Sequence, residues 1–478
     1  MKNIISCYIL AALLICTASC NTKKTNETPD IPIISKILSD ASSMFYMDFS
    51  KYPKERKNLS IGIFDSGTGG LTVLEKILAC DEYNNATGEM QPDGIPDFIN
   101  ENFNYLGDIA NMPYGNYANE NKNDYLRELV IKDALFLLKE KTSKIIVVAC
   151  NTATAYGLAD ISNLLEKSGT GIRVIGVINA GVNATLLPLD RSQDYAIGVL
   201  ATPGTIASDA YERTILKVKD ELAFTGKITV INQSGAGFAE SVDGEKNYVD
   251  RSLMSVCDSY RGPKIGEEEN SINMQLMDVY NFDVTNNALL ATQAKDGLHV
   301  QLNSSGNYAR FHLVSLIEKY RASGNTTPLK RIILGCTHYP YLLDTLNQVI
   351  YELKNYTKDG QYVYKNLIAE DFEFIDPALF TAKECYEALK NSNQLVSQPT
   401  QGSVYAYVSI SAPDLSADKL TEDGSLTYDF KYGRTTGLEE NTTIVVPFSH
   451  KYVGDDVMLR LEKLVPHSFS AIKKTMEE

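Results

Sequence analysis

The chain has 478 residues, with 45 Lys and Arg against 60 Asp and Glu, so its formal net charge is −15 at pH 7. This length predicts two or three domains, and the apolar content of 44% is ordinary for a globular protein. The acidic balance argues against a nucleic-acid backbone as partner, so we expect no nucleic-acid binding.

A signal-like segment, residues 1–20, opens the chain with "MKNIISCYILAALLICTASC". Lys2 precedes an apolar stretch typical of a signal-peptide core. The small residues before Cys20 resemble the lipobox of bacterial lipoproteins, although Thr17 stands where Leu is usual. The resemblance implies cleavage before Cys20, lipidation of that Cys, and a membrane-anchored protein of the cell envelope, on the periplasmic or outer-membrane face. An ordinary cleaved signal or an uncleaved anchor would explain the same letters.

Residues 21–58 follow as a polar tether, "NTKKTNETPDIPIISK", and an N-terminal extension. The cysteines that remain after Cys20 are Cys80, Cys150, Cys257, Cys336 and Cys385. Scattered and odd in number, without a CxxC pair, they do not indicate a disulfide framework. The 5 His are also scattered, and we predict no metal site.

The first organised stretch, residues 59–78, is "LSIGIFDSGTGGLTVLEKIL" and predicts a strand, a glycine turn and a helix. Free N–H groups at such a helix start can hold a carboxylate or a phosphate. No Gly-Lys-Ser/Thr follows, which excludes a P-loop. Asp65 ends the predicted strand and faces the expected ligand crevice, where it suits a cationic group or a proton relay.

A polar loop is predicted next, over residues 81–103, before "YLGD". Its run "DGIPD", residues 93–97, resembles a calcium-binding repeat, since oxygen ligands on a tight turn suit Ca²⁺. A single short match is weak evidence, and a polar loop is the favoured explanation of the run.

Further strand-to-loop units follow along the chain. Their apolar runs are typical of parallel strands that are buried on both faces. They are "SKIIVVACNTATAYGL" (143–158), "IRVIGVINAG" (172–181), "YAIGVLATPGTIAS" (195–208) and "RIILGCTHYPYLLDTL" (331–346).

Two of these strands end in a thiol, Cys150 and Cys336. Ligands of open α/β sheets bind beyond the carboxyl ends of the strands, where backbone dipoles can lower the pKa of a thiol. Two thiols that face one another across a crevice can remove a proton from a carbon and return one on the opposite side. A single Cys at a buried strand end is more often inert packing. Here the neighbouring Thr, Asn and His residues favour a chemical role for both thiols.

Seven stretches, in order, resemble the cofactor-independent aspartate/glutamate racemases, most closely the glutamate racemases. They cover roughly residues 59–390 and read "GIFDSGTGGLTVL", "LGDIANMPYG", "VVACNTATA", "IGVINAG", "IGVLATPGTIAS", "LGCTHYPYL" and "FIDPA". As a set they are specific, although no single one is.

The resemblance implies an isomerase that works without pyridoxal phosphate or any other cofactor. Cys150 and Cys336 would be its acid/base thiols, assisted by Asp65 and His338 respectively. The substrate would be an acidic amino acid, glutamate ahead of aspartate. The residues that would hold it are Asp65, Ser66, Tyr114, Gly115, Asn151, Thr152, Thr337 and His338. Because an α-proton beside a carboxylate is very weakly acidic, the site must exclude water and offer preorganised donors.

Departures from the family pattern bear on the choice of substrate. Asn111 stands where the family often has Arg, and the residues after "PYG" lack the usual Lys-Ser. Asp243 lines up with a Glu of the family, a change that shortens the side chain by about one methylene.

For the fold, we predict an α/β protein with two similar doubly wound parallel-sheet lobes, related by a pseudo-twofold axis, and a site between them. Lobe 1 would span residues 59–173, and lobe 2 residues 174–357 with an insertion at about 245–330 that could be a lid or a partner surface. Residues 358–478 would return to lobe 1 and add a C-terminal extension, whose closing helix "VMLRLEKLVPHSF" would pack on the core.

Two alternatives stay open beside racemisation of an acidic amino acid. One is a binding lipoprotein that captures amino acids without catalysis. The other is a related racemase or decarboxylase of another α-substituted acid. Export favours scavenged or released amino acids as substrates, since D-glutamate for the cell wall is made in the cytoplasm. The expected partners are the small-molecule amino acid and, through the lipid anchor, the membrane. A homodimer is compatible with the sequence, which does not fix the oligomeric state.

Overall fold

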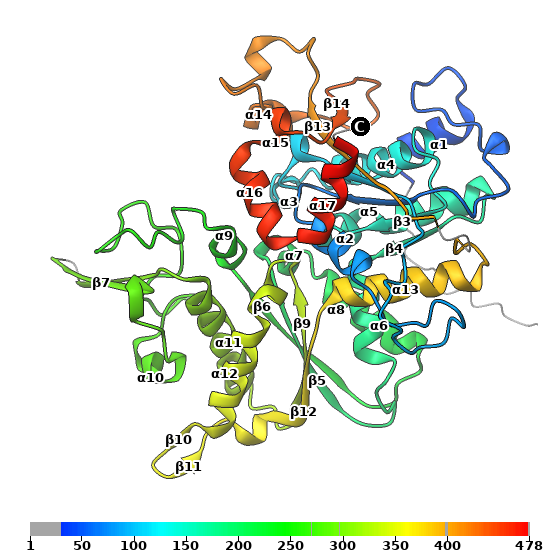
Figure 1. Ribbon diagram of the computed structural model, residues 1–478. Helices are drawn as coiled ribbons and strands as arrows, with labels where there is room; N and C mark the ends of the chain where they lie inside the picture. The colour runs from blue at the N-terminus through cyan, green and yellow to red at the C-terminus, as the bar shows by residue number, and fades with distance from the viewer. Residues whose placement is uncertain (1–29, 269, 296, 397–399, 477–478) are drawn as a thin grey trace, which may run out of the picture. The chain divides into compact units, whose positions relative to one another are not determined.

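The computed structural model describes residues 30–476, apart from residues 269, 296 and 397–399 (Figure 1). The predicted signal peptide at 1–20, the lipidation site Cys20 and the tether up to residue 29 lie outside the described residues. No helix in the described part of the chain has both the length and the apolar character needed to span a bilayer.

Lobe 1 is built on a six-stranded sheet in the order β14-β13-β2-β1-β3-β4. All neighbours are parallel except β13 and β14, which are antiparallel. The β1 and β3 segments, "IGIFD" and "IIVV", are fully buried, as strands covered by helices on both faces must be. The strands are β1 (Ile61–Asp65), β2 (Phe103–Gly107), β3 (Ile145–Val148), β4 (Arg173–Gly176), β13 (Val404–Ser411) and β14 (Thr443–Pro447).

Lobe 2 is built on a four-stranded parallel sheet in the order β12-β9-β5-β6. Two antiparallel hairpins, β7–β8 and β10–β11, stand apart from it (Figure 1). The strands are β5 (Tyr195–Ala201), β6 (Ile228–Ser234), β9 (Leu329–Gly335), β12 (Ile368–Ile375), β7 (Leu289–Ala294), β8 (Gly297–Leu302), β10 (Thr357–Lys358) and β11 (Gln361–Tyr362).

Helices cover both faces of each sheet. In lobe 1, α1, α4 and α5 pack on one face and α2, α13 and α17 on the other; in lobe 2, α6 and α8 face α11 and α12 across the sheet. The helices are α1 (Pro32–Ser39), α2 (Leu71–Leu78), α3 (Gly115–Asn119), α4 (Asn123–Lys139), α5 (Asn151–Ser168), α6 (Val177–Leu186), α7 (Pro203–Ala207), α8 (Ala210–Glu221), α9 (Phe238–Asp243), α10 (Met277–Tyr280), α11 (Ser305–Ala322), α12 (Leu343–Asn355), α13 (Pro377–Asn391), α14 (Tyr428–Gly433), α15 (His450–Val453), α16 (Asp455–Leu464) and α17 (Pro466–Met476).

This architecture confirms the predicted α/β class with parallel sheets, of which that of lobe 1 has the antiparallel edge strand β14, while the pseudo-twofold relation stays a prediction. The lobe boundaries need correction. Strand β4 pairs with β3, so lobe 1 extends to residue 176 and not 173. Strand β12 pairs with β9, so the chain stays in lobe 2 until Ile375, and its return to lobe 1 at 358 was predicted too early.

The insertion is shorter than the predicted 245–330. Helix α11 belongs to the core of lobe 2, where Phe311, Val314 and Ile317 are fully buried. The inserted segment therefore ends near residue 304, and buried amides fasten it to the lobe. Asn307 of α11 accepts a hydrogen bond from Asp283 N at 2.8 Å and donates to the carbonyl oxygen of Asp283 at 2.9 Å.

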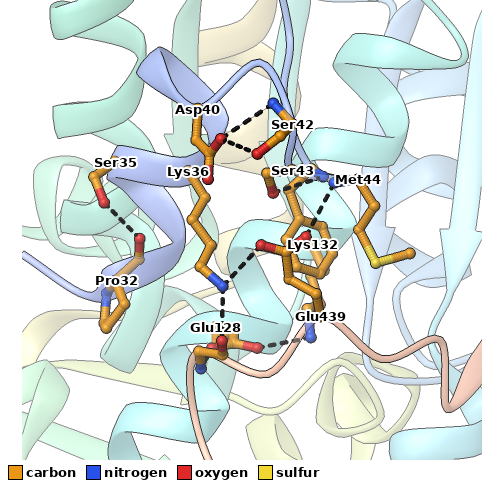
Figure 2. Close-up of polar contacts among 12 residues, drawn as sticks. Pro32, Ser35, Lys36, Asp40, Ser42, Ser43, Met44, Glu128, Lys132 and Glu439 are labelled. Atoms are coloured by element: carbon orange, nitrogen blue, oxygen red, sulfur yellow. Dashed lines mark hydrogen bonds and ion pairs between the residues drawn. The ribbon is translucent and has the colours of Figure 1, made fainter.

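The N-terminal extension is folded onto lobe 1 from residue 31 onward, so the predicted tether ends earlier than the sequence indicated. Ile33, Ile34 and Ile37 of α1 are buried against the helices of that face. Figure 2 shows Lys36 pointing at Glu439 of the C-terminal extension, 2.9 Å away. The Lys36 Nζ group also donates to the carbonyl oxygen of Gly437 at 2.7 Å.

Candidate active site

A cavity of about 530 Å³ lies at the carboxyl ends of the two sheets and contains both predicted thiols in its wall. Cys150 follows β3 and is the N-cap residue of α5, whereas Cys336 follows β9. Their exposed fractions are 7% and 5%. The structure therefore brings together, on one cavity, two thiols that come from different sheets.

The other residues predicted for the site line the same cavity. They are Asp65, Ser66, Tyr114, Gly115, Asn151, Thr152, Thr337 and His338. A cavity wall of hydroxyls, amides and helix starts supplies the kind of donors that a carboxylate ligand needs. The roles assigned to these residues stay predictions.

Tyr114 lines the cavity, but its hydroxyl is already hydrogen-bonded to buried carboxyl groups. The hydroxyl oxygen lies 2.5 Å from Oδ2 of Asp108 and 2.6 Å from Oδ2 of Asp133. One hydroxyl proton cannot serve two carboxylates, so one of the two acids must carry a proton. Burial, with the nearby Asp108 charge, raises the pKa of Asp133 well above its usual range, which identifies it as the protonated acid. Tyr114 is thus held rigidly by a buried network.

Asp65 is fixed by the glycine turn after β1. Its Oδ2 accepts hydrogen bonds from Gly67 N at 3.1 Å and Gly70 N at 2.9 Å. A Cβ atom at position 70 would lie 2.4 Å from the Cβ of Asp65, so only glycine allows this approach. The turn therefore sets the position of an acid at the start of α2.

Cys150 is a thiol in the free site. Burial raises its pKa to about 12, with the Asp65 carboxylate adding to the rise. Hydrogen bonds oppose this effect: Ala153 N donates to the sulfur at 3.4 Å, and the Ser66 hydroxyl lies 3.5 Å from it. The sequence led us to expect a lowered pKa from the helix start. That expectation is wrong for Cys150, because desolvation outweighs the backbone dipoles.

Cys336 has a cationic neighbour. Its sulfur lies 3.6 Å from Nδ1 of His338, whose Nε2 lies 3.2 Å from Oδ1 of Asp243 on α9. Burial alone would lower the pKa of His338, but the interactions with Asp243 and Cys336 outweigh it and raise the pKa to about 10. The imidazole is therefore protonated at neutral pH and places positive charge beside the Cys336 sulfur.

Sequence reasoning missed several residues of the cavity wall. Arg460, Leu461, Leu464 and Val465 come from the C-terminal helices, and Glu240 comes from α9. The closing segment was predicted as one helix; it forms two, α16 and α17, which pack on the core of lobe 1, and no pattern in their residues indicates that they reach the cavity. Tyr211 was also missed; its hydroxyl donates to Oδ1 of Asn151 at 2.9 Å and so orients that amide.

The acidic side chains of residues 93–97 accept hydrogen bonds from backbone N–H groups of the surrounding loop, residues 81–103. Asp93 accepts from Ile95 N at 3.0 Å and Asn85 N at 2.8 Å, and Asp97 accepts from Glu82 N at 2.9 Å. Across residues 30–476, with the gaps noted above, no three His, Cys, Asp or Glu side chains are grouped so that they could hold a metal ion. The five cysteines in that range are all free.

Comparison with known proteins points to one enzyme class. No family model matches the chain. It is 37% identical over 167 residues to the glutamate racemase of Oceanobacillus iheyensis, covering 35% of this chain and 50% of that protein. It is 33% identical over 199 residues to the glutamate racemase of Lactobacillus helveticus, covering 42% of this chain and 61% of that protein.

The chain is similar to glutamate racemases. It spans about half the length of the curated relatives that it matches. The crystal structure of a glutamate racemase of Bacillus anthracis superposes with a TM-score of 0.45 and 23% identity, over 74% of this chain and 89% of that one. A superposition this loose adds nothing to the topology described above.

Proposed function

We propose that the protein is an amino-acid racemase that inverts the α-carbon of an acidic amino acid, glutamate ahead of aspartate, without a cofactor. One observation carries the proposal: Cys150 and Cys336, from two different sheets, line one cavity. The similarity to glutamate racemases supports the same reaction.

The two thiols differ in their surroundings, which suggests which of them gives a proton and which takes one in the resting protein. Cys150 holds its proton, because burial raises its pKa to about 12. Cys336 lies 3.6 Å from Nδ1 of the protonated His338, and we assign it the role of the base. The Cys336 thiolate would take the α-proton from one face while the Cys150 thiol gives its proton to the other. The product leaves with inverted configuration, and the thiolate then resides on Cys150.

The remaining groups of the cavity would lower the cost of the carbanion-like transition state. The start of α5 presents the amides of Asn151 and Thr152, and the turn after β1 presents Ser66. Donors that are fixed before the substrate arrives stabilise developing charge without reorganisation. Recovery of the starting state requires the proton on Cys336 to return to Cys150 through solvent or a second turnover.

Incubation with L-glutamate in heavy water tests the proposal. We expect deuterium at the α-carbon together with formation of the D-isomer. The variants Cys150→Ser and Cys336→Ser should each lower turnover by about a hundredfold or more, since acid/base catalysis contributes roughly 10²–10⁴, while glutamate binding survives. Tight binding without exchange would instead support the amino-acid-binding lipoprotein. Exchange with another α-substituted acid in a substrate panel would support the related racemase.

We also propose that the protein is an exported lipoprotein anchored in the cell envelope through Cys20. The support is the segment at 1–20 alone, which lies outside the described residues. Mass spectrometry of the mature N-terminus should show a diacylglyceryl-modified Cys20, and Cys20→Ala should release the protein from the membrane fraction. An unmodified N-terminus elsewhere in the chain would reject the anchor. A homodimer stays a prediction.

A further inference from the structure

The C-terminal helices α16 and α17 form one wall of the cavity. Figure 1 shows them in red beside α2, and the described contacts hold them there. Leu461 and Ile472 are buried in the core of lobe 1. The Glu75 carboxylate of α2 accepts hydrogen bonds from Ser468 N at 2.7 Å and His467 N at 3.1 Å. Glu75 thus satisfies free N–H groups at the start of α17 and fixes that helix on lobe 1.

The same segment reaches lobe 2. The Tyr341 hydroxyl donates to the carbonyl oxygen of Leu464 at 2.9 Å. Nε of Arg460 lies 3.5 Å from Oδ1 of Asp243, the carboxylate that also pairs with His338. The end of α16 therefore touches both lobes at the cavity, and Arg460 lies one side chain away from the imidazole that neighbours Cys336.

Charge around the cavity makes Arg460 unusual. It is the one Lys or Arg among the described residues that line the cavity. The acidic side chains of the lining are Asp65, Glu240, Asp243 and Glu245. The other positive charge of the lining, on His338, is already paired with Asp243, so a second carboxylate of the substrate would depend on Arg460 as its cation.

The geometry leaves the guanidinium able to bind a carboxylate. Only Nε faces Asp243, and no described residue forms a hydrogen bond with either Nη atom of Arg460. The side chain is 30% exposed, and the cavity wall includes it. The planar fork of an Arg binds a carboxylate through two parallel hydrogen bonds, which a single ammonium group cannot reproduce.

We propose that Arg460 is the specificity-determining residue of the cavity, and that its two Nη groups bind the side-chain carboxylate of the acidic amino acid whose α-carbon lies between Cys150 and Cys336. This assignment rests on the proposed racemase function and adds to it a residue from the C-terminal extension. A purely structural role, in which Arg460 only holds Asp243 in place, would affect every substrate alike.

The test compares L-glutamate with L-glutamine, its neutral isostere, in the heavy-water exchange assay and in calorimetric binding. For Arg460→Ala we expect kcat/KM for glutamate to fall by roughly 10- to 100-fold, as loss of a charge-assisted hydrogen-bond pair implies, with most of the change in KM. The value for glutamine should change less than threefold, and Arg460→Lys should recover part of the loss. Leu459→Ala is the matched control, because Leu459 is also on α16 and is 68% exposed. It should leave kcat/KM unchanged for both substrates.

The outcomes separate this inference from the proposed function. If the full-length protein exchanges neither substrate but binds glutamate, and Arg460→Ala removes that binding selectively, the reaction is wrong and the assignment of Arg460 holds. If the protein racemises glutamate and Arg460→Ala leaves KM unchanged, or weakens glutamate and glutamine equally, the assignment is overturned while the reaction stands.

Discussion

Replacement of Asp243 by Asn should remove the positive charge from His338 at neutral pH. The pKa of His338 is raised from 6.5 to about 10, and the hydrogen bond to Asp243 is the largest contribution to that rise. A difference of this size corresponds to about 5 kcal/mol of preference for the charged imidazole. Asn cannot supply the charge, and burial still opposes protonation. We therefore expect His338 in the variant to titrate below about pH 7.

NMR of the imidazole ring signals across pH 5–10 measures this directly. The wild-type His338 signal should not titrate below about pH 9, whereas the Asp243→Asn signal should; a His338→Gln spectrum assigns the resonance. The sign for stability follows from the same pKa. The charged pair stabilises the fold fully below pH 6.5, and that contribution is lost as the pH rises through about 10.

The kinetic consequence is a loss of exchange. Without the imidazolium, Cys336 loses its positively charged neighbour, so the α-proton exchange rate at pH 7.5 should fall by about a hundredfold. Asp455→Asn is the control, because Asp455 forms an exposed pair with Nδ1 of His450 at 2.9 Å and should leave exchange unchanged. A wild-type His338 that titrates near 6.5, or one whose titration ignores Asp243→Asn, would refute the reasoning.

Three further substitutions test the fold and the glycine turn. Lys144→Met should lower the free energy of unfolding by about 3–5 kcal/mol in urea titrations, because the fully buried Lys144 Nζ pairs with the Glu101 carboxylate at 2.5 Å. Adding Glu101→Leu should recover part of this loss, and no recovery would contradict the role of the buried pair. Burial lowers the pKa of His312 to about 4, so on acidification the unfolded chain binds a proton that the folded chain does not. Between pH 7.5 and 5 the free energy of unfolding should therefore fall by about 2 kcal/mol more in wild type than in His312→Gln. An equal fall in both proteins would show that His312 is not buried uncharged. Gly70→Ala should displace Asp65 and lower exchange at least tenfold with an unchanged far-UV spectrum, whereas full activity would mean that the turn tolerates a side chain.

The clearest sequence indication of the site was the position of polar residues at the ends of apolar strands. The runs before Cys150 and Cys336 are apolar because helices cover both faces of a parallel strand, and the first polar letters mark where each strand stops. Carboxyl ends of parallel strands collect on one edge of a sheet, so both thiols could be placed at a crevice. The shared cavity agrees with that placement.

Contacts between distant segments gave no such signal. Arg460 of α16 meets Asp243 of α9 through the packing of the C-terminal helices on both lobes, and no local pattern in these helices indicates that contact. The pKa of Cys150 was mispredicted for the same reason, since burial by surrounding segments decides it. Helix α11 was assigned to the insertion because the stretch between Asp243 and Cys336 is longer than the core needs, although Phe311 and its neighbours are core residues.

The strand order of the two sheets has a consequence for how the chain acquires its structure during synthesis. The sheet of lobe 2 is complete once Ile375 has been made, because all four of its strands lie between Tyr195 and Ile375. In lobe 1, strand β2 instead pairs with β13, and α1 contacts the loop at Gly437; both partners are synthesised much later. Such distant pairings close slowly. A nascent chain therefore carries a finished second lobe beside a first lobe whose β2 edge is still open to other strands, and translation must nearly end before that edge is protected.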